Sequence, residues 1–265
     1  MREFMYDLNS VWIAGILFVS MVVAVEAGYR IGLRTRAAAS DSSKAHISAV
    51  QASLLGILAL LLGFTFSLSL QRFNSRSEAV VDEANAIGTA YLRAQLLPAP
   101  LRDDLQKALR DYLDLRVEAG SFSLADHAGR EALLAKTGRS QRALWAYARR
   151  AAEEDPRPVT TGLFIQSLNE LIDSFGRRDA ALNRHVPEMV LLLLYGTFLM
   201  AAIILGYASG VAGHRVSFVT YILVALIVLL VFIIIDLDRP RRGLIQVSHR
   251  SLTDLQAALR AEGDR

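Results

Sequence analysis

The sequence predicts an all-α, polytopic membrane protein with four transmembrane helices and a helical domain between the second and the third. Hydrophobic residues make up 53% of the 265 positions, and the excess over a typical soluble domain is concentrated in four blocks. Three of the blocks supply about 20 uncharged residues, which is the length that an α-helix needs to cross a bilayer, and the first block does so if it includes Glu26. The polar segment between the blocks repeats its apolar residues at helical spacing, with charges on the other face.

The four apolar blocks form two hairpins, one near each end of the sequence. The first block reaches the required length only if it includes Glu26, and we expect it to be retained. "MREFMYDLNS" before it has mixed charge, and no small-residue cleavage signature follows. The predicted spans are about 11–33, 47–70, 188–210 and 216–235. The predicted domains are 1–71 (N-terminal hairpin), 72–187 (helical domain), 188–236 (C-terminal hairpin) and 237–265 (tail).

The helical domain shows two amphipathic patterns separated by breaks. "LLPAP" (96–100), "AGSFS" (119–123) and "EDPRPV" (154–159) supply the breaks. The residues expected on the buried face are Leu101, Leu105, Leu109, Tyr112, Leu113, Leu163, Phe164, Leu168, Leu171, Ile172 and Phe175.

The basic residues near the span ends predict the orientation, because cytoplasmic loops carry an excess of Lys and Arg. One side holds ten arginines: Arg2, Arg72, Arg76, Arg177, Arg178, Arg184, Arg239, Arg241, Arg242 and Arg250. The other side holds five basic residues: Arg30, Arg34, Arg36, Lys44 and Arg215. The balance predicts that both termini and residues 72–187 are cytoplasmic, although the basic first loop opposes it.

The second span continues without a break signal into the helical domain. No proline occurs from 45 to 96, so an unbroken helix there would be about 75 Å long, of which about 30 Å would lie in hydrocarbon. Small residues follow each other at three- and four-residue steps on this helix: Ala52, Gly56, Ala59 and Gly63. Such a stripe indicates either ordinary close helix packing or a pore-lining helix in an oligomer.

"LGFTFSLSLQRF" resembles the second transmembrane helix of bestrophins, where Leu-Gly-Phe precedes an Arg followed by an aromatic residue. Here Phe64 lies eight residues before Arg72, and Phe73 follows it. Three further motifs resemble a bacterial family described as bestrophin-like: "EAGYRIG" (26–32), "EANAIGTAYLRAQLLP" (83–98) and "DLDRPRRGLI" (236–245). The resemblance extends over most of the chain and implies a bestrophin-like fold in a bacterial inner (plasma) membrane.

Bestrophins are pentameric ion channels, so the resemblance implies a homo-oligomer, with a pentamer favoured, that passes small ions through an axial pore. Phe64 matches a bulky neck position, and Leu60 would form a second ring. Gly56 stands where a third bulky ring would be expected, which implies a shorter or wider neck. Ser67 and Gln71 would rehydrate an ion below the neck. Anion and cation channels both occur among bestrophins, so the resemblance leaves the selectivity open.

Glu26 and Arg30 are the ionisable residues that the first span carries. A charge within a span is a candidate for an ion pathway or an intersubunit contact. The four-residue spacing also fits a simple Glu–Arg pair on one helix face, and both interpretations stay open.

"IDLDRPRRG" follows the fourth span at the predicted junction between membrane and cytoplasm. Bestrophins have an acidic calcium-binding cluster after this span. Three arginines next to two aspartates favour salt bridges over a metal site here. Pro240 would end the helix. The predicted junction residues are Arg72, Asp236, Asp238, Arg239 and Pro240.

"EANAIGTAYLRAQLLP" places the small residues Ala84, Ala86, Gly88 and Ala90 among polar ones. This composition fits a tightly packed helix seam. Packing around an oligomer axis and packing inside one subunit are equally compatible with it.

Enzyme signatures are absent from the sequence, so we predict no catalytic residue, cofactor or metal. No phosphate-cradling glycine loop or Gly-x-Ser-x-Gly occurs. The five histidines are scattered: His46, His127, His185, His214 and His249. The charge of +3 is too weak to indicate nucleic acid. The alternatives to a channel are a non-conducting membrane scaffold or signalling protein and, third, a proton-channel motor subunit of the MotA, TolQ and ExbB type.

Overall fold

A computed structural model of the chain describes residues 9–121, 127–184, 186–239 and 244–263. The described residues form helices and contain no strand, which confirms the all-α prediction. Two compact units divide the chain. The first, the membrane unit, comprises Met1–Arg72, His185–Arg239 and Gly243–Ile245. The second, the polar unit, comprises Phe73–Arg184, Pro240–Arg242 and Gln246–Arg265.

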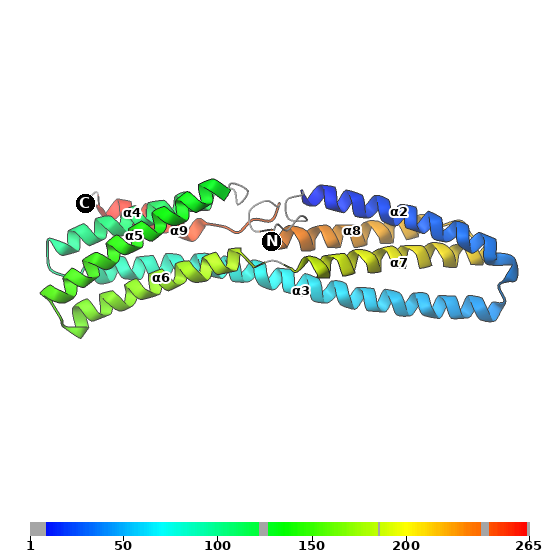
Figure 1. The fold of residues 1–265 in the computed structure, drawn as a ribbon, viewed down its shortest axis with the longest axis horizontal. Coiled ribbons are helices and arrows are strands. Elements are labelled where there is room, and N and C mark those ends of the chain that lie inside the picture. Colours follow the sequence, from blue (N-terminus) through cyan, green and yellow to red (C-terminus); the bar gives the residue numbers. More distant parts are fainter. Residues whose placement is uncertain (1–8, 122–126, 185, 240–243, 264–265) are drawn as a thin grey trace. The chain divides into compact units, whose positions relative to one another are not determined.

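The membrane unit is built from three whole helices and the first part of a fourth (Figure 1). The helices are α2 (Ser10–Thr35), α3 (Asp41–Ala94), α7 (Glu188–Ala212) and α8 (Phe218–Asp238), with the short 3₁₀ helix η1 at Arg36–Ala38. All four are long and apolar enough to cross a membrane. The prediction of four transmembrane helices is therefore confirmed.

Local signals set where these helices begin and end. The Asn9 side chain accepts a hydrogen bond from the Val11 backbone N–H at 3.0 Å and caps α2. The hydroxyl of Ser217 accepts from the Val219 N–H at 3.0 Å and caps α8 in the same way. Gly213, with φ of 77°, ends α7 in the left-handed conformation that favours glycine.

α2 and α7 approach each other through glycines. A Cβ atom on Gly28 would overlap the carbonyl oxygen of Ile203, and one on Gly206 would overlap the carbonyl oxygen of Val25. One turn further along each helix, Gly32 and Gly210 repeat this contact. Since the contacts advance in the same direction along both helices, α2 and α7 run parallel. Paired Gly-x-x-x-Gly motifs allow such close backbone approach in lipid, where packing rather than the hydrophobic effect holds helices together.

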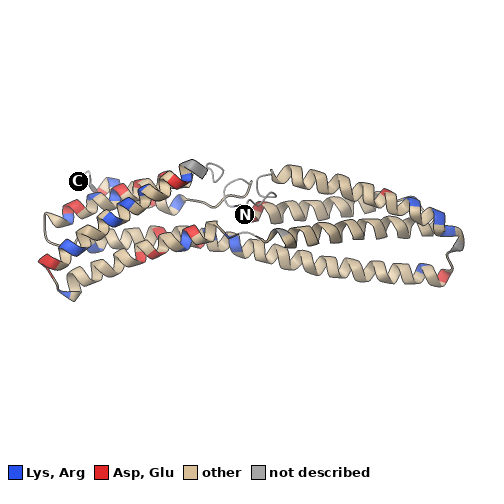
Figure 2. Ribbon diagram, viewed as in Figure 1, with Lys and Arg blue, Asp and Glu red and all other residues tan. Residues whose placement is uncertain are grey.

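The polar unit is a helical bundle around the second part of α3 (Figure 1). It contains α4 (Leu101–Ser121), α5 (His127–Glu154), α6 (Leu163–Leu182) and α9 (Arg250–Gly263), with the π-helical turn η2 at Pro158–Gly162. Charged residues are frequent along the helices of the polar unit, whereas the spans of the membrane unit carry few of them (Figure 2).

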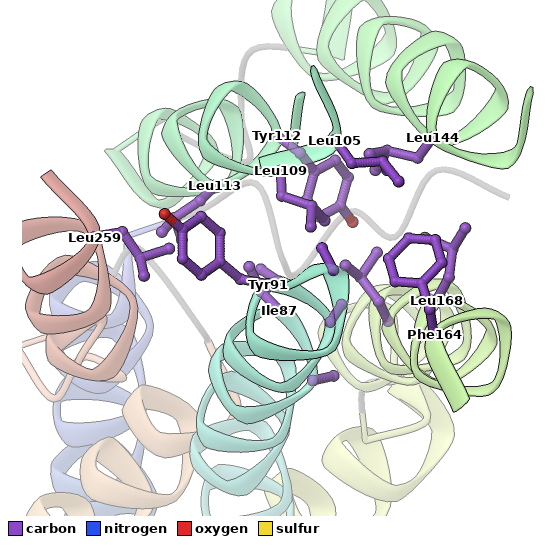
Figure 3. Packing of buried hydrophobic residues seen from close by; sticks show 14 of the residues in the cluster. Ile87, Tyr91, Leu105, Leu109, Tyr112, Leu113, Leu144, Phe164, Leu168 and Leu259 are labelled. Carbon is purple, nitrogen blue, oxygen red and sulfur yellow. The ribbon is translucent and has the colours of Figure 1, made fainter. Parts of the chain in front are cut away.

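The core of the polar unit matches the predicted helical faces. Tyr112 from α4, Phe164 and Leu168 from α6, and Tyr91 from α3 lie together with Leu144 of α5 (Figure 3). Most of the residues predicted for the buried face are buried, and Leu163, Ile172 and Phe175 are half-buried. Ala84, Ala86 and Ala90 belong to this core as well, which confirms packing inside one subunit for this motif.

The prediction of an unbroken helix through the second span is confirmed. α3 begins at Asp41, before the predicted start of the span, and ends at Ala94. The breaks predicted at "LLPAP" and "EDPRPV" lie between helices. The break predicted at "AGSFS" falls partly on residues outside those described.

The glycine contact between α2 and α7 predicts the effect of adding one methyl group. Gly206→Ala forces a Cβ into the Val25 carbonyl, so we expect it to destabilise the membrane unit by about 2 kcal/mol or more. Gly196 is the matched control, because it lies on the same helix and a Cβ there would meet nothing within 4 Å. Gly196→Ala should leave stability unchanged or raise it by up to about 1 kcal/mol. Thermal unfolding of the two variants in one detergent measures the difference, and equal melting temperatures would contradict the contact.

Candidate functional site: the exposed face of α3

The five residues predicted to line a pore lie on one exposed face of α3. Gly56, Leu60, Phe64, Ser67 and Gln71 are all exposed within the single chain. Phe64 keeps 62% of its surface and Leu60 keeps 59%. Their spacing of three and four residues keeps them on one side of a helix with 3.6 residues per turn. We call this side the α3 stripe.

The opposite side of α3 is the side that packs. Leu58 and Leu62 are each 5% exposed and belong to the core of the membrane unit. Thr65 and Ser69 continue this buried face. At about 100° per residue, the buried face and the α3 stripe are separated by roughly 180°. The helix therefore packs against its own chain on one side only.

The small residues on α3 make no close helix contact within the chain. A Cβ on Gly56 or on Gly63 would meet nothing within 4 Å, and Ala52 and Ala59 are exposed. The interpretation of this stripe as ordinary packing is therefore wrong for the single chain. The glycines that do allow close approach lie on α2 and α7 instead.

Glu26 and Arg30 form the predicted pair on α2. Arg30 Nε donates to Glu26 Oε1 at 2.7 Å, and both side chains remain partly exposed. Of the two interpretations of these charges, the structure thus shows the local Glu–Arg pair on one helix face. The pair lowers the cost of placing each charge in or near the membrane.

The junction after α8 is held by buried aspartates. Asp238 Oδ1 accepts from Arg72 Nη1 at 3.2 Å, and Asp238 Oδ2 accepts from the Val186 N–H at 2.9 Å. Asp236 Oδ2 accepts from the Ile245 N–H at 2.8 Å. The prediction of an ion-paired junction is confirmed by the pair between Arg72 and Asp238.

One partner of Asp238 lies far away along the sequence. Asp238 forms a salt bridge with Arg72, 166 residues away, whereas Arg241 and Arg242 lie outside the described residues. Arg239 is buried and donates from Nη1 to the Ser10 hydroxyl at 3.2 Å, which ties the end of α8 to the start of α2. Pro240 lies outside the described residues.

A buried ionic network joins three helices of the polar unit. Glu83 of α3 is fully buried, and its carboxylate accepts from Arg116 Nε of α4 at 2.6 Å. Its other oxygen accepts from Arg178 Nη1 of α6. Arg178 Nη2 also lies 3.1 Å from His249 Nδ1, just before α9. The Arg116 guanidinium stacks on the Phe175 ring, 4.7 Å from its centroid.

The network sets the charge states of its members, which lie outside the apolar spans. Burial alone would raise the pKa of Glu83, but the charges of Arg116 and Arg178 and their hydrogen bonds hold it below its usual value. Burial lowers the pKa of Arg178, against the opposing effect of Glu83. Burial also raises the pKa of Tyr112 to about 12. All three groups keep their ordinary charge at neutral pH.

A family model described as a bestrophin-like domain matches residues 17–252. The chain belongs to the bestrophin-like family. No protein of curated function matches its sequence.

Solved structures share the fold of this bestrophin-like protein. A tryptophan-to-alanine variant of a bacterial bestrophin homolog from Klebsiella pneumoniae is 17% identical, with a TM-score of 0.70 over 95% of this chain and 98% of its own. An aspartate-to-alanine variant of that homolog is 16% identical, with a TM-score of 0.70 over 96% and 99%. An isoleucine-to-threonine variant is 17% identical, with a TM-score of 0.66 over 94% and 99%. At these identities the likeness establishes the fold alone.

Sequence reasoning missed the buried network of the bestrophin-like protein. Glu83 was part of a quoted motif, yet its two arginine partners lie 33 and 95 residues further along the chain. One signal was available: Arg116 and Arg178 fall at positions that helical spacing places beside apolar residues of α4 and α6. Charged residues on an otherwise apolar face indicate buried pairing.

The network predicts the effect of removing the charge of Glu83. Glu83→Gln leaves two buried arginines without a carboxylate, so we expect it to destabilise the polar unit by about 3 kcal/mol at pH 7. Glu131→Gln is the control, because Glu131 is exposed on α5 and should change stability little. Chemical unfolding followed by circular dichroism measures both. An equal effect of the two variants would contradict the role of Glu83.

The same network predicts a dependence on pH with a definite sign. The pKa of Glu83 is lower in the folded chain than its ordinary value of 4.5, so its carboxylate stabilises the fold above that value. This contribution is lost as pH falls below the ordinary value toward the folded one. The stability difference between wild type and Glu83→Gln should therefore be constant near neutral pH and shrink on acidification. A difference that grows as pH falls would contradict the assignment.

Proposed function

We propose that the chain is a subunit of a homo-oligomeric ion channel whose axial pore is lined by the α3 stripe. The pentamer is the assembly that the resemblance to bestrophins implies. The observation that carries the proposal is the one-sided packing of α3. Its buried face packs into the core of the membrane unit. The other face, with Gly56, Leu60, Phe64, Ser67 and Gln71, is left exposed.

The chemistry of the α3 stripe favours a watery axis over lipid. Ser67 is exposed within the predicted span, and a hydroxyl in hydrocarbon without a partner is costly. Gln71, one turn after it and just past the predicted end of the span, adds a second polar group to the same face. In a symmetric oligomer, water in the axis would satisfy both groups. Membrane helices keep polar residues toward protein or water for this reason.

The apolar part of the α3 stripe would form the neck. Leu60 and Phe64 lie one turn apart, so each copy of the chain would contribute two apolar rings to the axis. Rings of this kind gate ion flow by dewetting. Gly56 offers no side chain one turn before Leu60, so the proposed neck has two rings, with Ser67 and Gln71 following it.

The neck predicts that removing the Phe64 ring increases ion flow. Phe64→Ala should raise the single-channel conductance or the open probability of purified protein in planar bilayers, because a wider constriction stays wet. Phe218→Ala is the matched control, since Phe218 is 77% exposed but lies on α8. It should leave the currents unchanged.

Two outcomes would contradict the channel. One is silence of both wild type and Phe64→Ala across common monovalent salts. The other is a native mass that corresponds to a monomer or dimer, because neither encloses an axis. Either result would favour the non-conducting scaffold instead.

The proposed location is a bacterial inner membrane, with both termini and residues 72–187 in the cytoplasm. Since the chain has no cysteine, single cysteines report the orientation without background. Glu153→Cys in the polar unit should be protected from an impermeant maleimide in intact cells. Ser42→Cys, at the start of α3, should be labelled. The reverse pattern would invert the topology.

A further inference from the structure

His249, the residue before α9, is hydrogen-bonded to the buried network of the polar unit. The guanidinium of Arg178 is charged and offers only N–H donors. Across the 3.1 Å that separate Arg178 Nη2 from His249 Nδ1, the imidazole nitrogen must therefore be the acceptor. An imidazole accepts at Nδ1 only when it is neutral and carries its proton on Nε2. The contact thus requires an uncharged His249.

The network opposes a positive charge on the His249 ring. Arg178 of α6 faces the ring directly. The carboxylate behind this guanidinium, on Glu83 of α3, is already shared by Arg178 and Arg116 of α4. The three network residues together carry one net positive charge before the imidazole is counted. A protonated ring would add a second one next to a guanidinium side chain that is only 1% exposed.

Carboxylates near His249 along α4 and α9 are paired with other cations. Glu118, two residues before the glycine of α4 that contacts the ring, forms a salt bridge with Lys136 of α5 at 3.7 Å. On α9, Asp254 Oδ2 lies 3.6 Å from Arg250 Nε. A helix N-terminus also carries partial positive charge, which disfavours an imidazolium at the start of α9.

His249 holds the first turn of α9 in place. Its carbonyl oxygen accepts from the backbone N–H groups of Leu252 and Thr253 at 3.1 and 3.3 Å. Its ring lies against Gly120 of α4, where an added Cβ would come within 3.1 Å of the ring atom Cδ2. Beyond this point α9 is held by the buried side chains of Leu252 and Leu259 and by exposed hydrogen bonds, which contribute little.

We propose that the contact between Arg178 and His249 is a pH-sensitive attachment that holds α9 on the polar unit at neutral pH and releases it on acidification. A histidine in water takes up a proton below about pH 6.5, and the ring becomes solvated when α9 is released. Proton uptake therefore favours the released state. Release would uncover part of the core, where Leu259 points toward Tyr91 of α3 (Figure 3). The inference concerns the polar unit alone and is independent of the proposed pore.

Hydrogen exchange followed by mass spectrometry tests this attachment on the full chain in detergent. After correction for intrinsic exchange rates, the protection of residues 250–263 in the wild type should fall about tenfold between pH 7.5 and pH 5.5, because release is coupled to the uptake of one proton. Protection of α4 and α6 should stay nearly constant, since carboxylates remain ionised over this range.

Three variants connect the response to His249. His249→Asn keeps an acceptor for Arg178 but takes up no proton, so the protection of α9 should not depend on pH. His249→Lys is charged at both pH values and should leave α9 unprotected at pH 7.5. His214→Asn is the control, because His214 is exposed in the membrane unit and its variant should keep the wild-type response.

Constant protection of wild-type α9 between the two pH values would overturn the inference. A tenfold response retained in His249→Asn, or full protection of α9 in His249→Lys, would also overturn it. Since the wild-type measurement alone can contradict the attachment, the test stands even if a variant does not fold.

Discussion

The one-sided burial of α3 is the constraint on which the rest of the structure depends. In the membrane unit, Leu58 and Leu62 anchor one face of α3 in the core, and Phe64 on the other face keeps 62% of its surface. A helix that was apolar all round could turn either face to its neighbours without cost. Ser67 removes this freedom within the predicted span, because its hydroxyl makes the exposed face less suited to lipid. In the proposed oligomer, water in the axis would surround that face.

The α2–α7 contact explains why the fold of the single chain does not need the exposed face of α3 for packing. Gly28 and Gly206 let the backbones of these helices touch, so α2 and α7 form a tight pair that α8 and the buried face of α3 complete. Because close packing is concentrated in that pair, the glycines of α3 are not needed for the fold of the single chain. In the proposed oligomer, Gly56 and Gly63 would therefore lie on the face that meets other copies or the axis.

The sequence predicted what depends on length, composition and periodicity. The four spans follow from blocks of about 20 apolar residues, and the faces of α4 and α6 follow from spacing. It did not predict partners that lie far apart along the chain. Arg72 pairs with Asp238, 166 residues away, and Arg178 pairs with Glu83, 95 residues away. At such separations, the residues next to each partner in the sequence do not indicate the pairing. Thus the spacing of charges around Asp238 indicated an ion-paired junction but not that Arg72 would be one of its partners.

The buried network of the polar unit fixes the rotation of the second part of α3. Glu83 is held by Arg116 and Arg178 from two other helices, and a misplaced partner would leave a charge buried without compensation. Such a pair adds little net stability, yet its strict geometry disfavours other rotations of the helix. Fixing Glu83 inward fixes Asp82, one residue before it, about 100° away toward the exposed side. The inward carboxylate of Glu83 thereby determines which side of this part of α3 stays exposed.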